Sequence, residues 1–287
     1  MGTVTTWASP AKINLFLHIN GRRADGYHEL QTVFAILADG DELSIETTNV
    51  DEVVVLPDLG FPMEENIVYR AAMLLKEHTG CKLGARITIN KHIPMGGGLG
   101  GGSSNAATAM CALNAIWHLN LEPIVLEKLG RTLGADVPVF IRGESTFADG
   151  VGEIFTSYPV KEQWCLVVTP KNTNVSTKAI FTNPDLPRHT PKLDPKTFVM
   201  AETKNDCEDL VKKIYPNVAI TLEWLLKYAH PRMTGTGASC FALFAHETEA
   251  RKAWSEMPAN LQGFVTKICQ KSPLKAQLDT FTKGECH

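Results

Sequence analysis

The 287-residue sequence lacks any apolar run long enough to cross a membrane. A membrane-spanning helix needs about 20 consecutive apolar residues, whereas runs such as Val53–Leu56 hold only a few. No basic segment followed by an apolar one stands near the first residue, so we expect no secretory signal. These absences predict a soluble protein without a membrane partner.

The sequence also lacks a cysteine pattern that would indicate disulfides or a zinc site. Its seven cysteines are scattered, and no Cys-x-x-Cys pair or Cys/His cluster with zinc spacing occurs. An odd number of separated cysteines favours free, mostly buried thiols in a reducing compartment. We therefore expect a cytoplasmic location.

Charge of one sign is not in excess either. The chain has 28 Lys and Arg against 31 Asp and Glu, a formal net charge of −3. Nucleic-acid-binding proteins usually carry a basic excess or stripe, so we expect no nucleic-acid partner. The balance is that of an ordinary globular protein, and we expect a monomer or a weak homodimer.

What is present is enough apolar material for a packed core, since 44% of the residues are hydrophobic. At about 150 residues per domain, the length predicts two domains or one large one. Near residue 164 a buried strand-like segment, CLVVTP, is followed by a proline-rich region over 184–195. We place the domain boundary there, which gives domains of 1–160 and 161–287.

Hydrophobic periodicity predicts a mixture of strands and helices, and therefore an α+β protein. Segment 3–19 predicts a strand with Ala11, Ile13, Leu15, Leu17 and Ile19 on one face and Lys12, Asn14, Phe16 and His18 on the other. Further strands are predicted over 31–38, 41–47, 85–93, 137–141, 164–169, 239–244 and 263–268. Helices are predicted over 66–78, 103–119, 123–133, 176–181, 207–214, 216–229 and 247–256.

The segment PMGGGLGGGSSNAA, residues 94–107, is the most informative part of the chain. Glycine fills six of the seven positions from 96 to 102, although glycine loses the most backbone entropy on folding. Such a run is useful where backbone N–H groups must surround an anion without interfering Cβ atoms. A helix follows, with Ser103 or Ser104 as its predicted cap, so its positive end adds to the site. A phosphate chain is the predicted occupant, and a flexible linker is the weaker alternative.

Two common phosphate loops do not fit this segment. The Walker form needs a Lys before its Ser or Thr, and none precedes Ser103. The dinucleotide form G-x-G-x-x-G is matched by Gly96, Gly98 and Gly101, but Glu122 lies between predicted helices and not at a strand end. An NAD-dependent oxidoreductase therefore stays an alternative, as does a nucleotide-binding module without catalysis.

The glycine-rich segment resembles the phosphate loop of the GHMP kinases. Two other segments agree in the order of that family: SPAKINLFL at 9–17 and the late glycine turn MTGTGAS at 233–239. The resemblance implies the two-domain GHMP kinase fold. Its N-terminal domain holds a left-handed β-α-β unit, as in ribosomal-protein-like folds, and its C-terminal domain is ferredoxin-like. ATP and Mg²⁺ are the implied cofactors, and the acceptor would meet ATP between the domains.

The resemblance also implies a set of nucleotide-binding residues. The loop would bind the ATP phosphates, Asn66 and Ile67 would lie near the adenine, and Lys91 leads into the loop. Ser104 is a candidate Mg²⁺ ligand. The predicted set is Pro94, Met95, Gly96, Gly97, Gly98, Leu99, Gly100, Gly101, Gly102, Ser103, Ser104, Asn66, Ile67 and Lys91.

Phosphoryl transfer to an alcohol also needs an acceptor for the hydroxyl proton. Asp136, in LGADVPVF, follows a predicted helix, and its carboxylate can face a cleft. An Asp in such a place is often only a turn residue, but the resemblance implies that it is the catalytic base. Lys12 and Asn14 are two residues apart on a strand and therefore point the same way. The resemblance implies that Lys12 is catalytic and stabilises charge on the acceptor oxygen, with Asn14 holding the hydroxyl.

Three strings narrow the resemblance: PAKINLFLHINGRRADGYHEL, LGADVPVF and FADGVGEI. They are similar to a branch of the family that phosphorylates the 2-hydroxyl of a cytidine diphosphate-linked methylerythritol, for isoprenoid precursors made without mevalonate. In that branch Tyr27 and His28 would recognise cytosine, Tyr27 by stacking and His28 by hydrogen bonding. Phe181 would be the second stacking face, with Thr177 beside it and Phe34 as a further member. A kinase for another small alcohol, such as homoserine, is the alternative.

Overall fold

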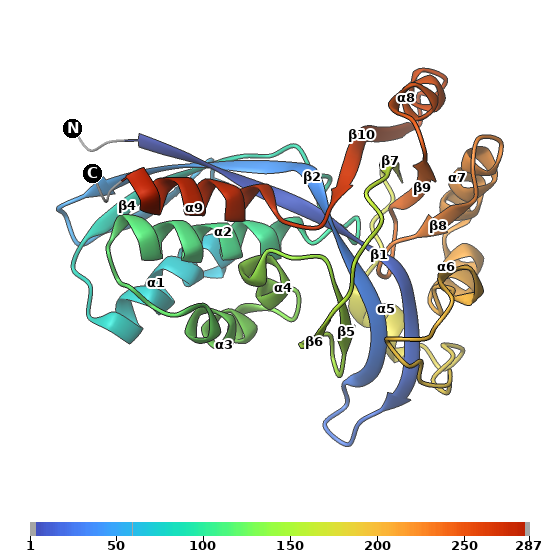
Figure 1. The fold of residues 1–287 in the computed structure, drawn as a ribbon, viewed down its shortest axis with the longest axis horizontal. Helices are drawn as coiled ribbons and strands as arrows, with labels where there is room; N and C mark the ends of the chain where they lie inside the picture. The colour runs from blue at the N-terminus through green and yellow to red at the C-terminus, as the bar shows by residue number, and fades with distance from the viewer. Residues whose placement is uncertain (1–3, 59, 285–287) are drawn as a thin grey trace.

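A long, bent hairpin joins the two halves of the molecule in the computed structural model, which describes residues 4–58 and 60–284 (Figure 1). Strand β1 (Val4–Arg22) pairs antiparallel with β2 (His28–Thr48) from one end to the other. The predicted strands 31–38 and 41–47 are therefore a single strand, in which the Asp39-Gly40 break does not stop the pairing. The hairpin crosses both halves and can thus carry side chains to a site between them.

The first half is a sheet covered by helices. Strand β4 (Gly84–Asn90) pairs with β2 on one side and, in parallel, with β3 (Val53–Leu56) on the other. Because parallel strands need a crossover, helix α1 (Ile67–Thr79) and the short turn η1 (Met63–Glu65) connect β3 to β4. This is the β-α-β unit that the family resemblance predicts. Helices α2 (Gly101–Ile116) and α3 (Pro123–Leu133) complete the layer.

The predicted strand 137–141 is wrong, because helix α4 (Val137–Arg142) occupies that segment. A short apolar run is compatible with either structure. Here Pro138 stands in the first helical turn, where proline is favoured, and Gly143 ends the helix in the left-handed conformation. The hairpin of β5 (Thr146–Asp149) and β6 (Ile154–Ser157) follows, and β5 pairs with β2.

The second half has the predicted ferredoxin-like topology. Strands β7 (Trp164–Pro170), β8 (Pro231–Met233), β9 (Cys240–Phe244) and β10 (Leu261–Cys269) lie in the order β10-β7-β9-β8, and all neighbours are antiparallel. Helices lie between β7 and β8 and between β9 and β10. They are α5 (Thr177–Thr182), η2 (Met200–Glu202), α6 (Glu208–Ile214), α7 (Pro216–Leu226) and α8 (Glu247–Ser255).

The cores of the two halves are linked by both ends of the chain. Leu17 and Ile19 of β1 belong to the core of the second half. The last helix, α9 (Pro273–Gly284), returns to the first half, where Leu274 joins the core and the ring of Phe281 lies 5.2 Å from that of Trp7. The domain boundary near residue 160 stays a prediction, and the chain crosses it again after β10.

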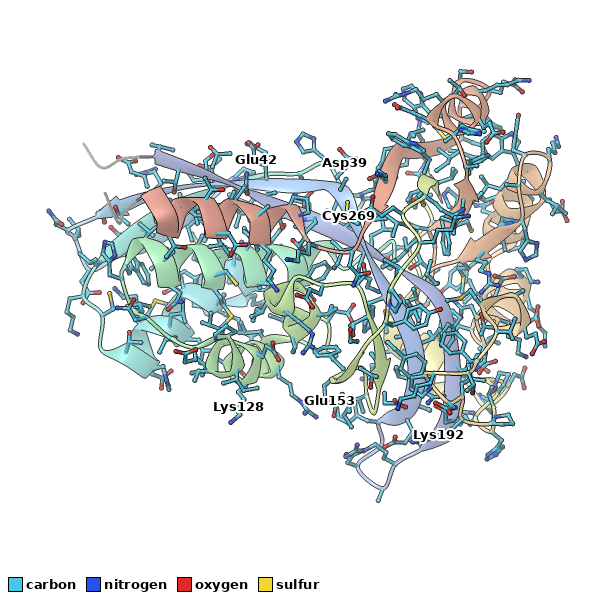
Figure 2. All side chains as sticks on the ribbon, viewed as in Figure 1. Asp39, Glu42, Lys128, Glu153, Lys192 and Cys269 are labelled. Atoms are coloured by element: carbon cyan, nitrogen blue, oxygen red, sulfur yellow. The ribbon has the colours of Figure 1, made fainter. Side chains whose placement is uncertain are left out.

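The described surface carries charged side chains, and most of the described cysteines are buried. Charged side chains such as Glu42, Lys128 and Lys192 point outward (Figure 2). In the described part of the chain, no helix has the length and apolar character to cross a membrane. The six cysteines described there are free, and four are buried. Burial raises the pKa of the Cys111 thiol to about 12, which makes it unreactive. Cys286 lies outside the described residues.

Candidate active site

The glycine loop forms a concave row of backbone donors between β4 and α2. Gly96, Gly98 and Gly100 have φ values of +70°, +76° and +72°, whereas the glycines between and after them do not. Residues that alternate in this way are typical of backbone nests, in which successive N–H groups form an anion-binding hollow. Helix α2 starts at Gly101 and adds the positive end of its dipole. The predicted cap at Ser103 or Ser104 is wrong, because the cap position has positive φ and is filled by Gly100.

Two other segments hold the loop in place. The amide of Lys12 on β1 donates to the carbonyl of Leu99 at 3.0 Å, and the amide of Ser239 donates to the carbonyl of Gly97 at 3.2 Å. A Cβ on Gly98 would lie only 2.6 Å from the carbonyl oxygen of Thr234. The loop is therefore pressed between the first strand and the late glycine turn, which explains why all three resembling segments belong to one site.

A pocket of about 430 Å³, which we name the nucleotide-side pocket after its predicted ligand, lies along the loop. Asn66 is the N-cap of α1, where its Oδ1 accepts from the amide of Val68 at 2.9 Å. The lining contains all the predicted nucleotide-binding residues except Ser104: Pro94, Met95, Gly96, Gly97, Gly98, Leu99, Gly100, Gly101, Gly102, Ser103, Asn66, Ile67 and Lys91.

Lys91 is fixed in this pocket by a buried carboxylate. Its Nζ pairs with Oδ2 of Asp41. Oδ1 of Asp41 accepts from the amides of His92 at 2.7 Å and Ile93 at 2.9 Å. Asp41 therefore anchors the beginning of the glycine loop as well as the lysine. Nothing in the local sequence pattern marks this aspartate.

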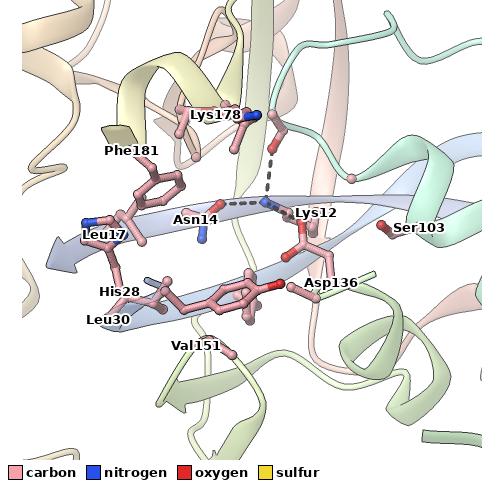
Figure 3. A pocket seen from close by; sticks show the side chains of 18 of the residues that line it. Lys12, Asn14, Leu17, His28, Leu30, Ser103, Asp136, Val151, Lys178 and Phe181 are labelled. Atoms are coloured by element: carbon pink, nitrogen blue, oxygen red, sulfur yellow. Dashed lines mark hydrogen bonds and ion pairs between the residues drawn. The ribbon is translucent and has the colours of Figure 1, made fainter. Parts of the chain in front are cut away.

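A second pocket, of about 470 Å³, lies on the other side of the loop (Figure 3). Its volume is within the range of small-molecule sites. Gly98, Gly100 and Ser103 line both pockets, so the two pockets meet at the loop. The second pocket brings together all the predicted catalytic and acceptor-binding residues: Lys12, Asn14, Tyr27, His28, Phe34, Asp136, Thr177 and Phe181.

Lys12 stands at the junction of the two pockets. Its Nζ donates to Oδ1 of Asn14 at 2.7 Å and to the carbonyl of Gly98 at 3.1 Å, and lies 3.4 Å from Oδ2 of Asp136 (Figure 3). The Lys12 side chain is 4% exposed, and its Nζ lies 5.4 Å from the centre of the Phe34 ring. The predicted shared face of Lys12 and Asn14 is thus present. The buried ammonium therefore lies where the two pockets meet.

Asp136 is free to act on a bound molecule. It occupies the N-cap position of α4, yet its side chain makes no capping hydrogen bond. An aspartate that served only the helix would accept from the first-turn amides. The carboxylate is instead 33% exposed and turned toward Lys12 in the pocket.

The face predicted for Phe16 and Leu17 is wrong. The β1–β2 register shifts between Asn14 and Leu17, and a bulge of this kind moves the following side chains to the opposite face. Phe16 accordingly joins a core with Ile13, whereas Leu17 lines the second pocket.

The far end of the pocket is aromatic. The centre of the His28 ring lies 5.2 Å from that of Phe181, and Tyr27, at the hairpin tip, is 64% exposed. Burial lowers the pKa of His28, and the positive charges of Arg188 and Arg22 lower it further. Both effects favour the neutral imidazole, in which one nitrogen is a donor and the other an acceptor.

Some residues at this pocket have no sequence signal. Lys178 lines it, and Arg188 donates to His28. Basic residues in polar segments are usually solvated, so only the fold reveals these. Thr177, which was predicted, bonds through its hydroxyl to that of Thr236 in the late glycine turn at 3.0 Å.

An anion-binding loop beside a lysine–aspartate pair is an arrangement suited to phosphoryl transfer. The chain matches the GHMP kinases N terminal domain over residues 66–144 and the GHMP kinases C terminal domain over residues 195–263. The chain belongs to the GHMP kinase family and is an ATP-dependent kinase. The resemblance found in the sequence and the two-domain α+β fold are thereby confirmed.

Within this family the chain is similar over almost its whole length to one kind of enzyme. The 4-diphosphocytidyl-2-C-methyl-D-erythritol kinase of Tolumonas auensis is 51% identical over 273 residues, 95% of each chain. That of Shewanella woodyi is 49% identical over 274 residues, 95% of this chain and 96% of the relative. A crystal structure of 4-(cytidine 5'-diphospho)-2C-methyl-D-erythritol kinase is 32% identical, with a TM-score of 0.81, and covers 92% of this chain and 99% of that one. The narrower resemblance is confirmed as well.

Proposed function

We propose that this chain transfers the γ-phosphoryl group of ATP to the 2-hydroxyl of 4-diphosphocytidyl-2-C-methyl-D-erythritol, giving ADP and the 2-phosphate. The observation that carries the proposal is the meeting of two pockets at one glycine loop, with Lys12 and Asp136 at the junction. The names of relatives that match 95% of the chain supply the acceptor. The reaction is a step in making isoprenoid precursors without mevalonate.

In this mechanism the loop fixes the phosphates and the junction residues act on the acceptor. The oxygen of the 2-hydroxyl attacks the γ-phosphorus of ATP while Asp136 takes the hydroxyl proton. The bond between the γ-phosphorus and the bridging oxygen of the leaving ADP breaks. Lys12 stabilises the negative charge on the attacking and transferring oxygens. Asn14 receives the Lys12 Nζ on its Oδ1 and donates through Nδ2 to the Thr32 hydroxyl at 2.9 Å, so it keeps the ammonium in place. Its predicted contact with the acceptor hydroxyl remains part of the proposal.

The aromatic end of the pocket would bind the cytosine. Tyr27 and Phe181 would stack on the two faces of the ring, and His28 would hydrogen-bond to its edge. Phe34 lies under the Nζ of Lys12, so its contribution is to the catalytic end of the pocket and not to the base.

We propose Mg²⁺ as the metal that accompanies ATP. Among residues 4–58 and 60–284, no three His, Cys, Asp or Glu side chains are grouped to hold a metal. Mg²⁺ needs no such cage, because it is bound largely by substrate phosphates, with one or two protein groups. Ser103, which lines both pockets, offers a hydroxyl. Ser104 is fully buried and donates to the carbonyl of Pro10 at 2.6 Å. When bound, Mg²⁺ would neutralise phosphate charge.

We propose that the chain acts as a monomer or weak homodimer, with a small molecule as its partner and without nucleic acid or membrane. A reducing cytoplasm suits its free thiols.

The test of the proposed function is the identity of the product. The protein is incubated with Mg-ATP and the cytidylated acceptor, and the products are followed by ³¹P nuclear magnetic resonance. We expect a new phosphomonoester coupled to the methylerythritol at C2, with an intact diphosphate. A phosphate on another hydroxyl, or ADP formed without a phosphorylated acceptor, would contradict the proposal.

A further inference from the structure

Arg188 lies behind the aromatic end of the acceptor pocket and uses all of its hydrogen-bond donors. Its Nε donates to Nε2 of His28 at 3.1 Å. Its two terminal nitrogens donate to four backbone carbonyls, those of Phe181 at 3.1 Å, Asn183 at 2.6 Å, Pro184 at 3.4 Å and Leu186 at 2.9 Å. A guanidinium has five N–H groups, and here each has a partner. Arg188 is therefore rigidly placed.

This contact determines which nitrogen of His28 carries the proton. A guanidinium has no acceptor and stays protonated in proteins. Nε2 of His28 must therefore present its lone pair to Arg188. In a neutral imidazole the proton is then on Nδ1.

Nδ1 is the nitrogen left for a ligand. His28 lines the acceptor pocket. No hydrogen bond within the described residues uses its Nδ1, and this atom is not among the buried polar atoms that lack a partner. It is thus open to a molecule in the pocket, and it can only donate to it.

We propose that Arg188 is a positioning residue that locks His28 in the Nδ1–H tautomer and so makes the pocket select cytosine over uracil. Cytosine presents an acceptor at N3, whereas uracil presents an N–H there. Two donors facing each other leave both unsatisfied, which a buried site tolerates poorly. The proposal rests on the proposed function, because it assumes that His28 faces the Watson–Crick edge of the base.

The proposal predicts an effect that a purely structural role would not produce. Without Arg188 the proton of His28 can move to Nε2, and Nδ1 then accepts from the N3–H of uracil. A uridine-linked ligand should therefore bind better in absolute terms. If Arg188 only braced segment 181–188, its removal would weaken both ligands alike.

The experiment compares wild type, Arg188→Met and a matched control, Asn183→Ala. Methionine keeps much of the length of the side chain but has no donor. Asn183→Ala removes the side-chain bond to the amide of Asp185 in the same segment and leaves the Asn183 carbonyl available to Arg188. kcat/KM is measured with the cytidine-linked acceptor and its uridine-linked analogue, and Kd with CDP and UDP.

We expect Arg188→Met to lower the cytidine-to-uridine ratio at least about tenfold, the equivalent of one hydrogen bond. The kcat/KM for the uridine-linked acceptor should rise, while kcat with the cytidine-linked acceptor changes little. Asn183→Ala should keep the wild-type ratio. An unchanged ratio in Arg188→Met, or a wild type without preference, would overturn the proposal.

The tautomer of His28 can also be measured directly in the wild type, so this test does not depend on the folding of a variant. The ¹⁵N shifts and long-range proton couplings of the His28 ring report its tautomer, and we expect Nδ1–H at pH 7.5. An Nε2–H tautomer would overturn the proposal. If the wild type failed to phosphorylate the cytidylated acceptor, the proposed function would fail, whereas the tautomer and the CDP–UDP comparison would still decide the role of Arg188.

Discussion

Replacing Asp136 by Asn tests the chemistry at the pocket junction with little disturbance of the fold. The carboxylate is 33% exposed and makes no capping bond to α4. Lys12 keeps its bonds to Asn14 and Gly98 when the charge is removed. Solvent reaches the carboxylate and screens the ion pair, and the asparagine amide oxygen can still accept a hydrogen bond from the Lys12 ammonium. We therefore expect the free energy of unfolding to change by less than about 1 kcal/mol.

The rate should change far more. A positioned general base contributes about 10²- to 10⁴-fold, which corresponds to about 2.7–5.4 kcal/mol in the activation free energy. We expect kcat of Asp136→Asn to fall by that factor. The Kd for Mg-ATP should stay the same, because Asp136 does not line the nucleotide-side pocket.

Single-turnover phosphorylation separates the chemical step from binding, and calorimetry gives the Kd for ATP. Glu144→Gln is the matched control. Glu144 is 34% exposed and pairs with Lys275 at 2.6 Å, but it lies outside both site pockets. The Glu144→Gln variant should phosphorylate the acceptor at the wild-type rate. A rate for Asp136→Asn within fivefold of wild type would refute its role as the base.

Three further changes test the loop and the buried histidines. Gly98→Ala puts a Cβ on a residue in the left-handed conformation and against a carbonyl, so the free energy of unfolding should fall by at least about 1–2 kcal/mol and KM for ATP should rise. Gly21→Ala is the matched control, because its Cβ would meet no atom within 4 Å and Gly21 lines neither pocket, so it should change neither quantity. Asp41→Asn removes the partner of the Lys91 ammonium and should raise KM for ATP while sparing KM for the acceptor. Burial lowers the pKa of both His18 and His28 in the folded protein. Below about pH 6.5 the unfolded chain therefore binds more protons than the folded chain, and Tm should fall from pH 7 to pH 5. The fall should be less steep in His18→Gln, which has lost one of the two groups.

The parts of the site that depend on local pattern could be predicted from the sequence. The glycine run between a strand and a helix indicates an anion-binding site, because few other structures need so many glycines in one loop. Lys12 and Asn14 share a face because they are two residues apart on a strand. Asp136 was different, since its sequence neighbourhood describes an ordinary helix start, and only the family resemblance pointed to catalysis.

The remaining features of the site depend on contacts between residues far apart in the sequence, which could not be predicted. Arg188 meets His28 across 160 positions, and Asp41 meets Lys91 across 50. No periodicity reports such pairs. The bulge after Asn14 is also invisible to alternation, which assumes a regular strand, and it exchanged the faces of Phe16 and Leu17.

The alternation of φ along the glycine loop could not be predicted from the sequence either. A run of six glycines gives no sign of which residues adopt the left-handed conformation, because every glycine tolerates it. Contacts with Thr234 and Ser239, far along the chain, select the conformation. The helix therefore begins two residues before the expected serine cap.

We propose that this chain transfers a phosphoryl group from ATP to a cytidine-linked alcohol. The most direct measurement is ADP release from Mg-ATP with three acceptors: the cytidylated methylerythritol, the same sugar alcohol without CDP, and homoserine. We predict turnover only with the cytidylated acceptor, because the aromatic end of the pocket must be filled to place the hydroxyl at Asp136. Equal turnover with the free sugar alcohol, or turnover with homoserine, would contradict the acceptor assignment.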